Sequence, residues 1–140
     1  MGTARQAFGA CVCTDRIYVA GGYNSGQQIL SSCEFYDLAE DKWSAFPSMP
    51  WPAYGHNLAA VNQRLLIGFG FNKTPHRNAE CMLVLDTWNL NRGWSQVWFK
   101  NELNSVGCQQ GLVPLTEGKK RVHELLIFGG LVNEETQECS

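Results

Sequence analysis

The chain has 140 residues, of which 44% are hydrophobic and 17% are charged, and its formal net charge is −2. This length suffices for one hydrophobic core, and the small net charge gives no reason to expect binding to nucleic acid or to an anionic membrane. No stretch approaches the roughly 18 apolar residues of a membrane-spanning helix. The N-terminus has no basic segment followed by an apolar one, so no signal peptide is visible.

One short segment occurs three times along the chain, and each copy is an apolar run that ends at glycine. The copies cover residues 16–24, 64–72 and 125–131. The first two lie 48 residues apart (70 − 22) and the last two lie 60 apart (130 − 70). A period near this length indicates a repeat architecture, in which each unit buries its apolar faces by packing on its neighbours.

Each complete unit is predicted to supply four short strands. Another apolar run precedes each glycine-terminated run, at residues 8–13, 58–61 and 108–115. A third run, 33–37 in the first unit and 81–86 in the second, is followed by a turn and a tryptophan. Short runs rich in β-branched and aromatic residues and bounded by turn signals indicate strands. Paired glycines at a strand end allow positive φ and close backbone approach.

This order of elements resembles the kelch repeat, in which the second strand ends in Gly-Gly, the third ends in Tyr-Asp, and a tryptophan follows. The first unit, residues 4–50, fits closely, whereas the second, 51–100, carries Phe69 and Leu85 at a glycine and a tyrosine position. The third unit, 101–140, has Gly-Gly but no later Tyr-Asp or tryptophan. The motif residues are Gly21, Gly22, Tyr36, Asp37, Trp43, Gly70, Asp86, Trp94, Gly129 and Gly130.

The resemblance implies an all-β fold made of about two and a half four-stranded kelch blades, which is an incomplete β-propeller. Propellers typically have about four to eight blades, so ten strands cannot close a ring. We therefore expect a segment of a longer kelch protein whose remaining blades complete the ring. Self-assembly of identical short chains is the alternative.

The cysteines and histidines do not form a recognisable metal-binding or catalytic motif. No Cys-x-x-Cys motif and no Cys/His cluster with zinc spacing is present, so neither a metal nor a cofactor is expected. Cys33 and Cys81 are predicted to occupy matching places in neighbouring units, as small buried apolar residues. The six cysteines are expected to be free thiols in the reducing environment of the cytoplasm. His56 follows Gly55 where kelch repeats commonly carry Gly-His, so its expected role is structural.

Function is therefore expected to lie on a surface. In kelch propellers, partner proteins usually meet loops on one rim, and this resemblance points by position to Arg5, Tyr23, Asn24, Tyr54, Phe71, Asn72, His76 and Arg77. Arginine and tyrosine are enriched in interface hot spots. The expected function is non-catalytic protein–protein interaction within a larger scaffold or adaptor protein. The alternative is a segment of a kelch-type propeller enzyme, a copper oxidase or sugar isomerase, whose catalytic residues lie mostly outside this chain.

Overall fold

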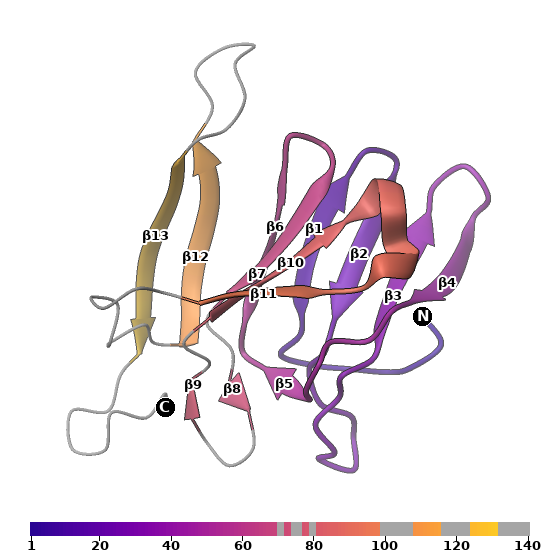
Figure 1. Cartoon of the computed structure of the whole chain (residues 1–140). Helices are drawn as coiled ribbons and strands as arrows, with labels where there is room; N and C mark the ends of the chain where they lie inside the picture. Colours follow the sequence, from indigo (N-terminus) through magenta and orange to yellow (C-terminus); the bar gives the residue numbers. More distant parts are fainter. Residues whose placement is uncertain (70–71, 74–76, 79–80, 99–107, 116–123, 132–140) are drawn as a thin grey trace.

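A first four-stranded antiparallel sheet is made by the N-terminal unit of the computed structural model (Figure 1). Its strands, in spatial order, are β1 (Gly9–Cys13), β2 (Arg16–Ala20), β3 (Cys33–Asp37) and β4 (Lys42–Phe46). Consecutive strands pair with each other, so the sheet is a simple meander. The structure describes residues 1–69, 72–73, 77–78, 81–98, 108–115 and 124–131.

The second unit repeats this arrangement. Its sheet has the order β6 (Asn57–Val61), β7 (Leu65–Phe69), β10 (Cys81–Asp86) and β11 (Ser95–Trp98), and the 3-10 helix η1 (Thr87–Arg92) connects the last two strands. A small rim sheet is formed by three two-residue strands, β5 (Ala53–Tyr54), β8 (Asn72–Lys73) and β9 (Arg77–Asn78). A hairpin of β12 (Cys108–Leu115) and β13 (Glu124–Leu131) follows.

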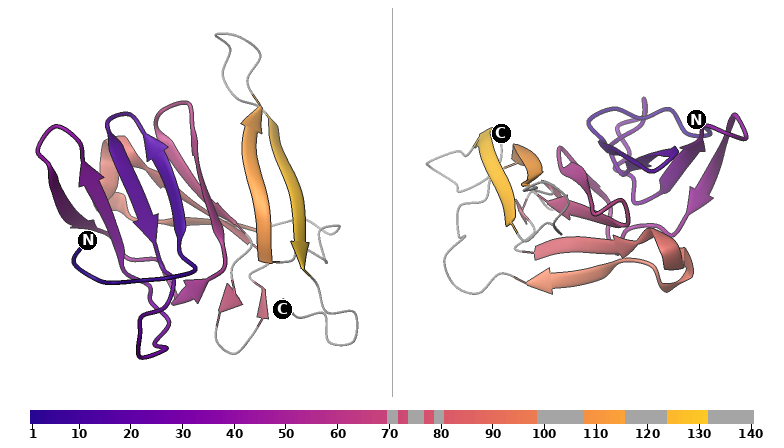
Figure 2. Two further views of the ribbon diagram at one scale, coloured as in Figure 1. Left: turned by 180° about the vertical axis from the view of Figure 1, so that it is seen from behind. Right: turned by 90° about the horizontal axis from the view of Figure 1, so that it is seen from above.

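The sheets are arranged radially, as in a propeller. Their first strands lie next to one another, because β6 contacts both β1 and β12. Seen from above, the sheets fan outwards from these strands (Figure 2). The expected fold class, an all-β structure of incomplete kelch-type propeller blades, is confirmed.

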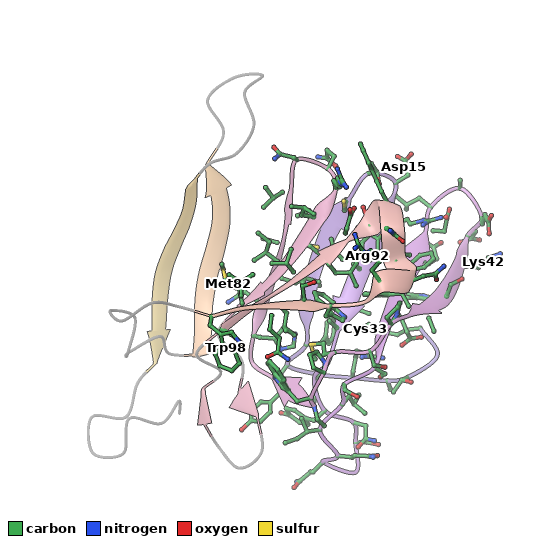
Figure 3. All side chains as sticks on the ribbon, viewed as in Figure 1. Asp15, Cys33, Lys42, Met82, Arg92 and Trp98 are labelled. Carbon is green, nitrogen blue, oxygen red and sulfur yellow. The ribbon has the colours of Figure 1, made fainter. Side chains whose placement is uncertain are left out.

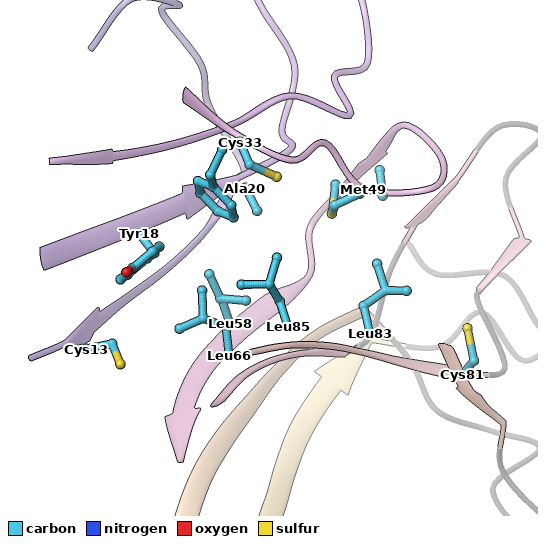
Figure 4. Packing of buried hydrophobic residues seen from close by; sticks show 12 residues of the cluster. Cys13, Tyr18, Ala20, Cys33, Met49, Leu58, Leu66, Cys81, Leu83 and Leu85 are labelled. Carbon is cyan, nitrogen blue, oxygen red and sulfur yellow. The ribbon is translucent and has the colours of Figure 1, made fainter. Parts of the chain in front are cut away.

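The main hydrophobic core lies between the two four-stranded sheets (Figure 4). Tyr18 and Phe46 of the first sheet meet edge to face, with ring centroids 5.4 Å apart. Leu66, Leu83 and Leu85 of the second sheet belong to the same buried cluster. The facing surfaces of the two sheets therefore bury their apolar side chains against each other, as expected for a repeat protein.

The spacing between the two units changes at the first turn of each sheet. The β1–β2 turn contains Thr14 and Asp15, whereas the β6–β7 turn contains residues 62–64. After this extra residue, matching positions lie 49 residues apart rather than 48, so that Leu66 corresponds to Ile17 (66 − 17). This assignment follows because Ile17 pairs across the sheet with Tyr36, and Leu66 pairs with Leu85.

The prediction that Cys33 and Cys81 occupy matching places is therefore wrong. Cys33 lies four residues before Asp37, whereas Cys81 lies five residues before Asp86. Side chains alternate between the faces of a strand, so the two thiols point to opposite faces of their own sheets. Because these faces are turned towards each other, both cysteines are buried in the shared core.

Candidate functional site

The candidates Tyr23, Asn24 and Tyr54 lie on the rim where the chain enters the first strand and leaves the second strand of a sheet. In the first unit, Tyr23 forms bridges with Gln6 and with Ile29. The backbone N–H groups of Gln6 and Tyr23 donate to each other's carbonyl oxygens, both at 3.0 Å. The rim sheet β5–β8–β9 is the corresponding structure in the second unit. The sequence did not reveal these short pairings, because two-residue strands leave no periodic pattern.

The loop after the paired glycines is held by its own hydrogen bonds. The side-chain oxygen of Asn24 accepts a hydrogen bond from the Gln28 backbone N–H at 3.0 Å, and its amide nitrogen donates to the Gln28 side chain at 3.2 Å. The Gln27 N–H donates to the Asn24 carbonyl at 2.9 Å. Asparagine commonly closes turns in this way. The exposed tip from Ser25 to Gln28 is therefore presented in one conformation.

Two tyrosines from different units meet on this rim. The rings of Tyr23 and Tyr54 are 5.8 Å apart and perpendicular, an edge-to-face geometry that aromatic pairs favour. Both side chains are half-buried. A depression of about 200 Å³ adjoins Tyr23, with Arg5, Gln6 and Ser25 among the residues that line it.

Arg5 is a structural residue rather than an exposed rim residue. Its side chain is fully buried, and its guanidinium donates to the carbonyls of Gly21 (2.9 Å) and Ser32 (2.8 Å) and to the Glu34 carboxylate (2.7 Å). Burial favours a raised pKa of Glu34, but hydrogen bonds from Gly2 and Arg5 outweigh it and lower that pKa. Two of the guanidinium nitrogens thus anchor the N-terminal segment, and the buried side chain does not support the prediction that Arg5 contacts a partner.

The remaining candidates are only partly described. Asn72 and Arg77 lie in β8 and β9, on the same rim as Tyr54. Phe71 and His76 lie outside the described residues. Of the expected set, the structure thus brings together Tyr23, Asn24, Tyr54 and the strands that contain Asn72 and Arg77.

The paired glycines explain how the rim segment can pack so closely. Gly21 and Gly22 have φ values of +63° and +88°, a region that disfavours side chains. A Cβ at Gly21 would lie 2.5 Å from the Ala53 carbonyl oxygen, and one at Gly22 would lie 2.5 Å from the Gln6 carbonyl oxygen. Glycine is therefore required for the chain segments that carry Gln6 and Tyr54 to approach β2. Gly70 and the side-chain surroundings of Gly129 and Gly130 lie outside the described parts of the chain.

The aspartates of the motif hold the opposite rim. Asp37 accepts hydrogen bonds from the backbone N–H groups of Ala39 and Glu40 and from Arg16, and these bonds lower its pKa, with the Glu40 contribution the largest. The Asp86 carboxylate accepts two hydrogen bonds from Arg64 in the same way. The first two units therefore each close this rim with an arginine–aspartate pair.

The motif tryptophans face the preceding side of their sheets. The ring of Trp94, just ahead of β11, lies 6.1 Å from that of Phe46, and its indole N–H donates to the Pro47 carbonyl at 2.9 Å. Trp43 is half-buried and packs on Tyr36, with ring centroids 5.4 Å apart. The Tyr36 hydroxyl bonds to the Asp41 carboxylate. Trp94 thus joins two sheets, whereas Trp43 lies on an open sheet face.

The titratable residues of the described chain are consistent with structural roles. Cys11, Cys13 and Cys33 are free thiols, and burial raises the pKa of Cys11 to about 12 and that of Cys33 to about 11. Such thiols are poor nucleophiles at neutral pH. Within the described ranges, no group of three or more His, Cys, Asp or Glu residues could hold a metal ion. Over the same ranges, no helix has the length and hydrophobicity to cross a membrane.

Sequence comparison identifies relatives for most of the chain. A family model for the Kelch motif matches residues 4–50. Kelch-like protein 41a of Danio rerio is 33% identical over 90 residues, which is 63% of this chain and 15% of that protein. Human Kelch-like protein 34 is 30% identical over 100 residues, which is 71% of this chain and 15% of that protein. Spermatocyte protein spe-26 of Caenorhabditis elegans is 34% identical over 92 residues, which is 66% of this chain and 15% of that protein. The matched regions thus span about one-seventh of each of these relatives.

Proposed function

The chain belongs to the kelch-repeat family, and from this premise we propose that it is a non-catalytic protein–protein interaction module that binds its partner through the rim around Tyr23 and Tyr54. The observation that carries the proposal is the pairing of these two tyrosines across the junction between units. Tyrosine is enriched at interfaces because it offers a large apolar ring with a polar tip.

The shape of the rim supports the same proposal. The Asn24 loop is ordered by local hydrogen bonds, so little conformational entropy is lost when a partner binds to it. The depression beside Tyr23 offers a place for one partner side chain. We extend the proposal to the setting of the protein, which is a larger cytoplasmic scaffold or adaptor whose other blades complete the propeller. Free thiols in the described chain support a reducing compartment.

Site-specific photo-crosslinking in the full-length protein tests this function. A photoreactive residue in place of Ser25, which is exposed at the tip of the Asn24 loop, is expected to capture a protein partner in cells, whereas one in place of Gln96, an exposed residue of β11, is not. Tyr54→Ala should reduce the capture at position 25 by at least about tenfold, as for a hot-spot residue. Equal capture from both positions, or capture that Tyr54→Ala leaves unchanged, would reject the rim as the binding surface.

A further inference from the structure

The opposite rim carries a second surface, built around an exposed tryptophan. Trp88 is 74% exposed, more than any other large hydrophobic residue whose burial is described. It lies in η1, which has no counterpart in the first unit, where a four-residue turn joins β3 to β4. Large exposed apolar side chains on a soluble protein often mark an interaction site. The kelch repeat itself therefore does not explain why Trp88 is exposed.

The position of Trp88 is fixed by the structure around it. Its backbone N–H donates to the Asp86 carboxylate at 3.0 Å, and the Arg64 guanidinium lies 4.4 Å from its ring centroid. The Thr87 backbone N–H and hydroxyl both donate to the Arg64 carbonyl, at 2.9 and 2.7 Å. The indole is therefore held in place while most of its surface remains in water, so binding to it would cost little ordering entropy.

Trp88 lines two depressions. The first depression, which we call the turn-side groove, lies between Trp88 and the turns of the first sheet and has a volume of about 310 Å³. Its lining includes Thr14, Asp15, Arg16, Asp37 and Thr87. The second depression has a volume of about 460 Å³, and the described residues that line it are Asn62, Arg64, Leu65 and Trp88. Both adjoin the indole on the rim where Figure 3 shows Asp15 beside η1.

The charges of the turn-side groove leave one carboxylate available. Arg16 and Asp37 neutralise each other through a 2.9 Å ion pair. Asp15 forms no ion pair among the described residues, and its backbone carbonyl accepts a hydrogen bond from the Leu38 N–H at 3.1 Å, which anchors the turn. The charge of Arg64, whose guanidinium contacts the Trp88 ring, is likewise neutralised by its ion pair with Asp86. The residues that line the groove therefore present an aromatic ring and a net negative charge. This combination is complementary to a cationic side chain, which can contact the ring and pair with the acid.

We propose that the turn-side groove binds an extended segment of a partner protein that carries an arginine or lysine next to an apolar residue. The cationic group lies between the Trp88 indole and the Asp15 carboxylate. The apolar residue occupies the second depression, against Leu65 and Trp88. This surface is on the opposite rim from Tyr23 and Tyr54, so the chain can hold two partners at once.

Peptide binding to the whole 140-residue chain tests the proposal. The probe is a fluorescein-labelled tetrapeptide, glycine–leucine–arginine–glycine, with a blocked C-terminus, and its binding is followed by fluorescence anisotropy. Saturable binding is expected, at least about tenfold tighter than for the same peptide with glutamate in place of arginine, and weaker at high salt because the contact is partly electrostatic.

Matched variants assign the binding to the groove. Trp88→Ala should abolish measurable binding, and Asp15→Asn should weaken it by about threefold to tenfold, whereas Trp98→Ala and Glu40→Gln should not change it. Trp98 is 62% exposed on β11, away from the groove (Figure 3), and Glu40 is an exposed acid paired with Lys42. The proposal is overturned if both peptides bind equally, if the arginine peptide does not bind at millimolar concentration, or if Trp98→Ala weakens binding as much as Trp88→Ala. A Tyr54→Ala change should not affect this binding, so failure here is distinguishable from failure of the rim around Tyr23 and Tyr54.

Discussion

His56 lies between the two four-stranded sheets, with its imidazole closely packed against Gly9 and Gly21. A Cβ on either glycine would come within 2.8 Å of the ring. Burial lowers the pKa of His56 to about 4, against 6.5 for an exposed histidine, and a hydrogen bond with the Ala20 backbone opposes this shift only in part. The imidazole is therefore neutral in the folded protein at pH 7, as a structural role requires.

This burial predicts that the protein loses stability in mild acid. Between pH 6.5 and pH 4 the unfolded chain binds a proton at His56 that the folded chain does not, so the free energy of unfolding falls as the pH falls. The loss between pH 7 and pH 5 should be about 2 kcal/mol. Urea unfolding at both pH values measures it, and His56→Asn should remove most of the difference. A pH dependence that is the same in His56→Asn would show that other groups cause it.

Gly21 offers a second test at the level of single residues. Gly21→Ala forces a side chain into a positive φ and into the space of the Ala53 carbonyl, so it should cost about 2–4 kcal/mol of unfolding free energy. Gly26→Ala is the matched control, because a Cβ there would meet only the Asn24 side chain, at 3.4 Å. The control should change stability by no more than about 0.5 kcal/mol. Equal effects from the two substitutions would contradict the close approach of the rim segment to β2.

At the scale of the element, the last strand of the second sheet is tied to that of the first. The Trp94 ring packs on Phe46, and its N–H bonds to the Pro47 carbonyl. Trp94→Ala should therefore destabilise the protein by about 2–4 kcal/mol, and Trp94→Phe, which keeps a ring but loses the hydrogen bond, by about 1 kcal/mol. Trp43→Ala should cost less than Trp94→Ala, because Trp43 packs within its own sheet on an open face. Chemical denaturation of the three variants measures these changes in the free energy of unfolding. A larger loss for Trp43→Ala than for Trp94→Ala would contradict the assigned packing.

The strands themselves could be predicted from the sequence, since the glycine-terminated runs became β2, β7 and β13 and the preceding runs became β1, β6 and β12. Apolar runs bounded by turn residues carry a strong signal. The extra residue in the β6–β7 turn could not be located, because polar residues occupy this turn in either alignment. The helix η1 was also missed, since a six-residue 3-10 helix has turn composition and is too short for a periodic pattern.

The candidate site was predictable only in part. The position of Tyr23 and Tyr54 on one rim followed from the repeat, but their contact depends on the packing of one unit against the next. The burial of Arg5 could not be predicted, because a charged residue near a rim is usually exposed, whereas here Glu34 of β3 supplies its partner. Such long-range pairings leave no local trace in a sequence.

At the scale of the whole molecule, the outer face of the first sheet is a continuous apolar row. Val12, Ile17, Tyr36 and Trp43 are cross-strand neighbours on this face. Val12 is 61% exposed and the other three are half-buried. On the second sheet, the corresponding row contains Leu66 and Leu85 and is covered by the first sheet. An open row of this kind, next to sheet edges, favours association between chains.

We therefore expect the 140-residue chain to self-associate in solution, with this row in the contact. Val12→Lys should increase the monomer fraction, because it places a charge in the row at a position exposed enough to leave folding intact. Leu38→Lys is the control, since Leu38 is 53% exposed in the β3–β4 turn, outside the row. Size-exclusion chromatography with light scattering at several concentrations gives the mass of each variant. A monodisperse monomer of the unmodified chain at about 100 μM would rule the association out, since open sheet faces cause association at such concentrations. An equal effect of Leu38→Lys on the monomer fraction would show that the row is not the contact.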